Sequence, residues 1–310
     1  MAPFFAASEI HPGPVPSGTK DGVYVYHGNA DPDWAVHAVP QGGYVLALII
    51  RACIEHQVRS HTPDPIHVTA HYLRKASLGP LEVHIRAVRT GRTLSNLTAD
   101  LIQTGVVVMT THLVFGILNA STLPPPSFPL TLEPPSPHAR VTPFSTHPSE
   151  SANCPLAFPC PGVTATVDGT LGTLPNPSGG VDVGQWFTFS HPADMLTLPS
   201  LAFFSDLFPN LLPPVVAGGK LPASSCPTVV LTLEFKAPIP RGARTVGAYA
   251  VSRFLNDPQG RHDVYGELWT APEGEDNGDN WRQKQRCLAV SHQTALVIPM
   301  ALKRDGKSRL

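Results

Sequence analysis

The sequence predicts an α+β fold in which one helix-and-sheet unit is built twice. Two observations support this prediction: the same order of patterns occurs twice, and a proline-rich interval separates the two copies. A short helical pattern followed by four β-like runs starts at Pro40, and the same order starts again near Pro199. A chain of 310 residues has the length of about two ordinary domains. We therefore expect two antiparallel sheets, each wrapped around a long central helix and joined by a Pro-rich linker.

The first copy is assigned to residues 22–120, after an N-terminal tail of residues 1–21. GVYVYHG, from Gly22, alternates apolar and polar residues as a half-buried strand does. A helix is predicted from Gln41 to about His56, and its almost continuous apolar residues indicate burial on most sides. The runs IHVTAHYLR, LEVHIRAVR, TLSNLTADLIQ and GVVVMTTHLVFGIL follow with short turns, which is typical of an antiparallel meander.

Residues 121–180 are predicted to form the linker. Nine prolines lie within residues 121–150, which is incompatible with a regular helix or a central strand. The next thirty residues remain rich in Pro, Gly, Ser and Thr. We expect an extended segment that lies partly along the surface, with regular structure resuming near Val181.

The second copy is assigned to residues 181–300, followed by a tail of residues 301–310. VDVGQWFTF is the counterpart of the first strand, and LPSLAFFSDLFPNLL is the second helical pattern. Four further β-like runs follow, PTVVLTLEF, TVGAYAVSRFL, HDVYGELWT and RCLAVSHQTALVI. The order of elements therefore matches that of the first copy.

Composition limits the partners that we expect. Hydrophobic residues make up 42% of the chain and charged residues 15%, which supplies a core and shows no signature of disorder. A formal net charge of -1 gives no general field for nucleic acid or an anionic membrane. The sequence shows no signal-peptide pattern and no run of the ~18 apolar residues that a membrane span needs. The 5 cysteines form no C-x-x-C pair. We expect a soluble intracellular protein with reduced thiols.

The last three residues resemble a targeting signal. Ser308, Arg309 and Leu310 form a conservative variant of the serine-lysine-leucine peroxisomal address, which an import receptor reads. The alternative is a chance tripeptide on the polar tail of a cytoplasmic protein. We expect a peroxisomal location, with the import receptor as a partner.

Several common catalytic motifs are absent from the sequence. It has no G-x-S-x-G elbow, no G-x-G-x-x-G or Walker motif, and no H-E-x-x-H helix. His67 and His71 have the spacing of a helical metal pair, but they alternate with apolar residues as in a strand. We therefore expect neither a metal nor a cofactor.

Asp206 interrupts the apolar run LAFFSDLF in the second helical pattern. Burial of an unpaired carboxylate is costly, so such a residue needs hydrogen-bond partners or an unusual pKa. The alternative is an aspartate at a helix N-terminus or on an exposed helix face. The first copy is apolar at the matching depth, from Ala47 to Ile50. Only the second half is therefore predicted to be catalytic.

The chain resembles the double hotdog thioesterases of the acyl-CoA thioesterase II type and the wider thioesterase-like branch of that superfamily. In the first half the resemblance rests on Trp34, on VPQGGYVLALIIRA and on HVTAHYLRKASLGPLEVHIRAVRTGRTLS. In the second half it rests on LAFFSDLFP, PTVVLTLEFKAP, YGELW and AVSHQTALV. It covers roughly residues 22–118 and 181–298. The resemblance implies two hotdogs that form a pseudo-dimer within one chain, with further homo-oligomers left open.

The resemblance also implies a catalytic set of an aspartate, a threonine and a glutamine. These fall on Asp206 in F-S-D-L-F, Thr228 in C-P-T-V-V and Gln293 in S-H-Q-T-A. The residues after Thr228 and Gln293 depart from the usual family pattern. Taken singly, Thr228 also fits an ordinary β-branched strand residue, and Gln293 fits an outward polar position.

Thioester hydrolysis needs a polarised water and donors for the developing oxyanion. We expect Asp206 to accept a proton from the water, while Thr228 and Gln293 orient it. Backbone N–H groups at Gly42 and Gly43, where the first helix starts, are the expected oxyanion donors. Substrate binding is assigned to these two glycines together with Trp34 and Tyr44.

The expected reaction is hydrolysis of an acyl-CoA, or another acyl thioester, to a carboxylic acid and a free thiol. Fatty-acid or secondary metabolism would supply the substrate. One alternative is a tailoring enzyme, either a hotdog hydratase or dehydratase or a polyketide-releasing hydrolase. The G-D-x-N-P-x-H stretch usual in such hydratases is absent here. The other alternative is a non-catalytic acyl-binding protein, which an exposed Asp206 far from Thr228 and Gln293 would favour.

Overall fold

The computed structural model describes most of the chain. The described residues are 1–14, 22–36, 38–119, 132–133, 136, 138–156, 160–171, 181–209, 224–253, 255–256, 260–272 and 280–299. The predicted targeting tripeptide Ser308-Arg309-Leu310 lies outside them. None of the helices in the described ranges has the length and apolar character that would let it cross a membrane.

The first half consists of one long helix and a five-stranded antiparallel sheet. The helix is α2 (Gly42–Gln57), one residue away at each end from its predicted position. The strands are β2 (Val23–Ala30), β5 (Asp64–Tyr72), β6 (Gly79–Arg89), β7 (Ser95–Gln103) and β8 (Val106–Gly116). They are ordered β2-β6-β7-β8-β5 across the sheet. The short elements α1 (Phe4–Ala7), β1 (Ile10–Pro12), η1 (Pro32–Trp34), β3 (Ala35–Val36) and β4 (Val39–Pro40) precede the long helix.

The second half repeats this arrangement with a shorter helix, α3 (Leu198–Phe204). Its main strands are β11 (Val181–Phe189), β13 (Thr228–Phe235), β14 (Thr245–Ser252), β16 (Arg261–Thr270) and β17 (Cys287–Ala295). They are ordered β13-β17-β16-β14-β11, which mirrors the first half. Minor elements are β9 (Ala152–Asn153), β10 (Val163–Val167), β12 (Ser224–Ser225), β15 (Leu255–Asn256), α4 (Trp281–Lys284) and β18 (Ile298–Pro299).

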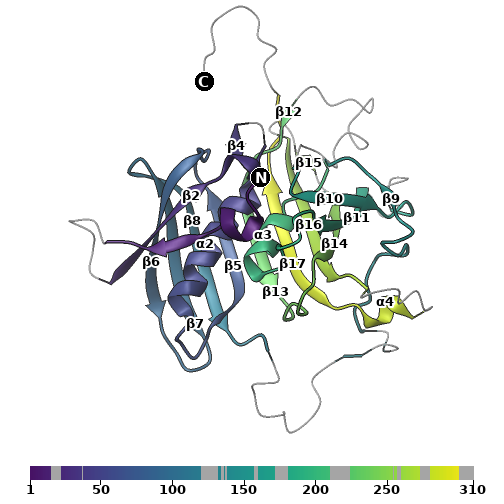
Figure 1. Ribbon diagram of the computed structural model, residues 1–310, viewed down its shortest axis with the longest axis horizontal. Coiled ribbons are helices and arrows are strands. Elements are labelled where there is room, and N and C mark those ends of the chain that lie inside the picture. Colours follow the sequence, from purple (N-terminus) through teal and green to yellow (C-terminus); the bar gives the residue numbers. More distant parts are fainter. Residues whose placement is uncertain are drawn as a thin grey trace, which may run out of the picture.

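The two halves share one sheet, where two separate sheets were expected. Strands β5 and β13 pair antiparallel, with Val68 opposite Leu233 and Ala70 opposite Leu231. An unpaired edge strand exposes a row of backbone donors and acceptors. The pairing of β5 with β13 satisfies these groups on one edge strand of each half. The result is a continuous sheet of 14 strands that curves around both helices (Figure 1).

Two further expectations differ from the structure. The second helix is not long: α3 has 7 residues and ends before Asp206. The helix ends well before Pro209, which restricts only the preceding residue, Phe208. Regular structure also begins within the predicted linker, where β10 pairs with β11 and buries Val163 and Ala165.

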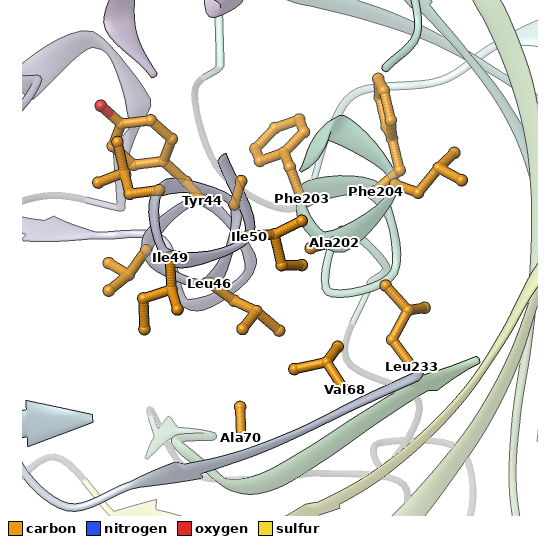
Figure 2. Close-up of a cluster of buried hydrophobic side chains, with 14 of the residues drawn as sticks. Tyr44, Leu46, Ile49, Ile50, Val68, Ala70, Ala202, Phe203, Phe204 and Leu233 are labelled. Carbon is orange, nitrogen blue, oxygen red and sulfur yellow. The ribbon is translucent and has the colours of Figure 1, made fainter. Parts of the chain in front are cut away.

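The two helices contact each other through small residues. Figure 2 shows α2 and α3 side by side, with Val68, Ala70 and Leu233 of the sheet beneath them. A Cβ atom placed on Gly43 would lie 2.2 Å from the carbonyl oxygen of Ala202, so only glycine permits this approach. Thr197 and Ser200 form a capping box that fixes the start of α3. The start of α2 is thereby held against the C-terminal part of α3.

Candidate active site

Asp206 lies where the two halves meet. It follows Ser205, the C-cap of α3, and its backbone N–H donates to the carbonyl of Phe203 at 3.2 Å. This turn places the carboxylate against the first turn of α2 in the other half. The residue is partly buried, and it is not at a helix N-terminus or on an exposed helix face.

Each carboxylate oxygen of Asp206 accepts two hydrogen bonds. The donors to one oxygen come from the first half of the protein, and the donors to the other come from the second half. Oδ2 accepts from the Gly43 N–H at 2.8 Å and from Gln41 Nε2 at 3.0 Å, both in the first half. Oδ1 accepts from Gln293 Nε2 at 2.6 Å and from the Thr228 hydroxyl at 3.3 Å, both in the second half. A carboxylate has about four lone-pair sites, so these donors stabilise its ionised form.

Thr228 and Gln293 are brought together by neighbouring strands. Thr228 is the first residue of β13, and Gln293 lies on β17, which pairs with β13. The Gln293 amide nitrogen donates to the Thr228 hydroxyl oxygen at 2.6 Å. Gln293 is only 4% exposed, so it does not occupy an outward position. The three side chains that the resemblance implied thus form one hydrogen-bonded group.

The pKa of the Asp206 carboxyl is raised to about 6, mainly because burial removes water from around it. The hydrogen bonds from Gly43, Gln293 and Thr228 act in the opposite direction, since they stabilise the charged form. Asp206 is therefore ionised at neutral pH. Its pKa is also close enough to neutral pH for the carboxylate to accept a proton.

Gln41 belongs to this group and was missed by the sequence analysis. Its Oε1 caps α2 by accepting from the Tyr44 N–H at 2.6 Å. This leaves Nε2 to donate to the Asp206 carboxylate, and also to the Asp206 backbone carbonyl at 2.8 Å. Its position just before the Gly-Gly pair was the available signal, because a polar side chain there can cap the helix.

The two glycines lie beside the carboxylate, and their expected role as oxyanion donors stays a prediction. The Gly43 N–H is engaged by Asp206, so in this structure it is not free to bind the substrate oxygen. A Cβ atom on Gly42 would lie 2.8 Å from Asp206 Oδ2. The absence of side chains at both positions lets the carboxylate reach the backbone.

Trp34 and Tyr44, which were assigned to substrate binding, lie in the core. Trp34 is 1% exposed and Tyr44 is 0% exposed. Trp34 packs edge-on against Phe4 and Phe203. The Tyr44 hydroxyl donates to the carbonyl of Ala7 at 2.5 Å. These contacts leave neither side chain open to a substrate.

Comparison with known proteins identifies related domains in both halves of the chain. An acyl-CoA thioesterase N-terminal domain model matches residues 30–116, and an acyl-CoA thioesterase C-terminal domain model matches residues 137–297. The thioesterase-like protein TwmA of Talaromyces wortmannii is 32% identical over 84 residues. That match covers 27% of this chain and 24% of the relative, so the chain spans about a quarter of the curated relative's length.

Solved structures show the same fold at low sequence identity. A hotdog-fold protein of unknown function from Alicyclobacillus acidocaldarius has a TM-score of 0.69 and 21% identity, with 96% of this chain and 98% of that chain covered. The acyl-CoA thioesterase II TesB2 of Mycobacterium marinum has a TM-score of 0.61 and 15% identity, with 90% and 94% covered. The two matched domain models together show that the chain belongs to the acyl-CoA thioesterase family.

Proposed function

We propose that the protein hydrolyses an acyl-CoA thioester by direct attack of water, with Asp206 as the general base. The observation that carries this proposal is the convergence of Gln41, Gly43, Thr228 and Gln293 on one carboxylate. Burying a charge is costly unless it is paired or hydrogen-bonded, and a site with these four donors holds the carboxylate ready in its ionised form.

In the proposed reaction, water attacks the thioester carbonyl carbon as Asp206 takes one of its protons. A new C–O bond forms, and the tetrahedral intermediate then collapses with cleavage of the C–S bond. The proton on Asp206 passes to the departing thiolate, which restores the carboxylate. The products are a carboxylic acid and a free thiol, without a covalent enzyme intermediate.

Thr228 and Gln293 orient the water in this proposal. Both side chains contact the same carboxylate oxygen, Oδ1, and they contact each other at 2.6 Å. The hydroxyl oxygen of Thr228 and the amide oxygen of Gln293 can accept the hydrogen that Asp206 does not take.

The family supports coenzyme A as the carrier of the acyl group. A non-catalytic acyl-binding protein would be favoured by an Asp206 far from Thr228 and Gln293. The contact of Asp206 with both residues therefore supports a hydrolase over that alternative.

A thiol-release assay across a panel of acyl-CoAs tests the proposal. The Asp206→Asn variant is expected to lose activity by about 10²–10⁴-fold, the range for a general base. Asp168→Asn is the matched control, because Asp168 is also buried and accepts hydrogen bonds from Ser145, Thr146 and Thr170. Activity per folded molecule should survive in that control. Full turnover by Asp206→Asn, or no turnover of any acyl-CoA by the parent protein, would contradict the proposal.

A further inference from the structure

We propose that Tyr72 is a positioning residue that acts on Asp206 through the Gly42–Gly43 peptide group. Tyr72 ends β5, and its phenolic hydroxyl donates to the carbonyl oxygen of Gly42 at 3.1 Å. The N–H of the same peptide group, on Gly43, donates to Asp206 Oδ2 at 2.8 Å. A single peptide group thus connects the phenol to the carboxylate. This inference rests on the proposed role of Asp206 as the base.

The peptide group transmits the effect in two ways. It is planar, so a hydrogen bond that fixes the direction of the carbonyl also fixes the direction of the N–H. A hydrogen bond at the carbonyl oxygen polarises the group, which strengthens the bond that the N–H donates by roughly 10–30%. Both effects favour the ionised form of Asp206.

The glycines make this connection sterically feasible. A Cβ atom on Gly42 would lie 2.8 Å from Asp206 Oδ2 and 3.2 Å from the Tyr72 ring. The ring and the carboxylate therefore both approach the same backbone position. Glycine leaves the backbone torsions there less restricted than any other residue, so the Tyr72 hydroxyl supplies a constraint that a side chain would otherwise give.

Tyr72 acts as a neutral donor and not as a charge. Burial, and the nearby charge of Asp206, raise the pKa of its phenol well above the ordinary value. The described groups that donate to the carboxylate itself are uncharged as well. They are Gln41, the N-cap of α2, Gly43 in its first turn, Thr228 from β13 and Gln293 from β17.

The Tyr72→Phe substitution removes the donor and keeps the ring. The acid limb of the kcat/KM profile is expected to move to higher pH by about 0.5 pH unit, which lowers kcat/KM about threefold at a pH well below the pKa. The rate on the alkaline plateau should change much less. Tyr44→Phe is the matched control, since it removes another buried phenol that donates to a backbone carbonyl. Its acid limb should coincide with that of the parent protein.

A second measurement separates this inference from the proposed reaction. The Asp206 carboxyl carbon can be titrated by NMR, with its signal identified by its absence in Asp206→Asn. Tyr72→Phe should raise the titration midpoint, and 3-fluorotyrosine at position 72, a more acidic donor, should lower it. A midpoint unmoved by both changes would overturn the connection. Midpoints that move as expected in a protein that turns over no acyl-CoA would support the connection and reject the proposed hydrolysis.

Discussion

The Gly43 amide nitrogen lies 2.8 Å from Asp206 Oδ2, although these residues are 163 positions apart in the chain. The first half thus contributes the start of its helix to the carboxylate of the second half. This contact ties the packing of α2 on α3 to the protonation of the proposed base.

Thr228→Val removes a hydroxyl with little change in volume. We expect kcat/KM to fall roughly 10²-fold, the lower range for loss of one preorganised hydrogen-bonding group. Thr232→Val is the control, because Thr232 alternates with the buried Leu231 and Leu233 and so faces away from them. The register shift between Thr228 and Val230 places Thr228 on the side of Leu231, opposite to Thr232. Steady-state kinetics on both variants test the assignment. Equal activity of the two variants would remove Thr228 from the catalytic group.

Gly43→Ala should affect stability and activity together. The added Cβ would meet the Ala202 carbonyl oxygen at 2.2 Å, so α2 and α3 must separate. We expect a loss of about 1–3 kcal/mol in the free energy of unfolding, as for other overpacked interiors. Gly169→Ala provides the comparison, since its Cβ would meet no atom within 4 Å. Denaturant unfolding measures both, and an unchanged midpoint for Gly43→Ala would contradict the close approach.

Gln41→Ala separates helix capping from support of the carboxylate. Loss of a cap costs about 1 kcal/mol, and Thr197→Ala, which removes the cap of α3, should cost a similar amount. Only Gln41→Ala also removes a donor to Asp206, so only this variant should raise the pKa seen in kcat/KM. If the two variants show the same pH profile, Gln41 is a cap and nothing more.

The pH dependence of the parent enzyme follows from the state of Asp206. In the proposed reaction the ionised carboxylate is the active form, and its pKa is about 6. Below that pH the carboxyl is protonated, so kcat/KM should fall tenfold for each pH unit, whereas above about pH 7 it should be level. A profile that stays flat from about pH 4.5 to 8 would rule out a base with this pKa.

Local patterns predicted the repeated elements well, because each depends on residues close in sequence. The helix from Gln41 followed from a continuous apolar run, and Asp206 was recognised from its apolar surroundings. Gln41 was missed because its partner lies 165 residues away. The pairing of β5 with β13 is likewise a tertiary contact without a local signature. The alternating segment from Val163 to Val167 was hidden by the Pro- and Gly-rich composition around it.

The pairing of β5 with β13 has a consequence for how the site assembles. The donors to Asp206 come from two similar folding units, but both units belong to one chain and one sheet. Their meeting is therefore unimolecular, and it does not weaken on dilution as a contact between separate subunits does. One unit supplies the acid, and the other supplies the backbone N–H that binds it.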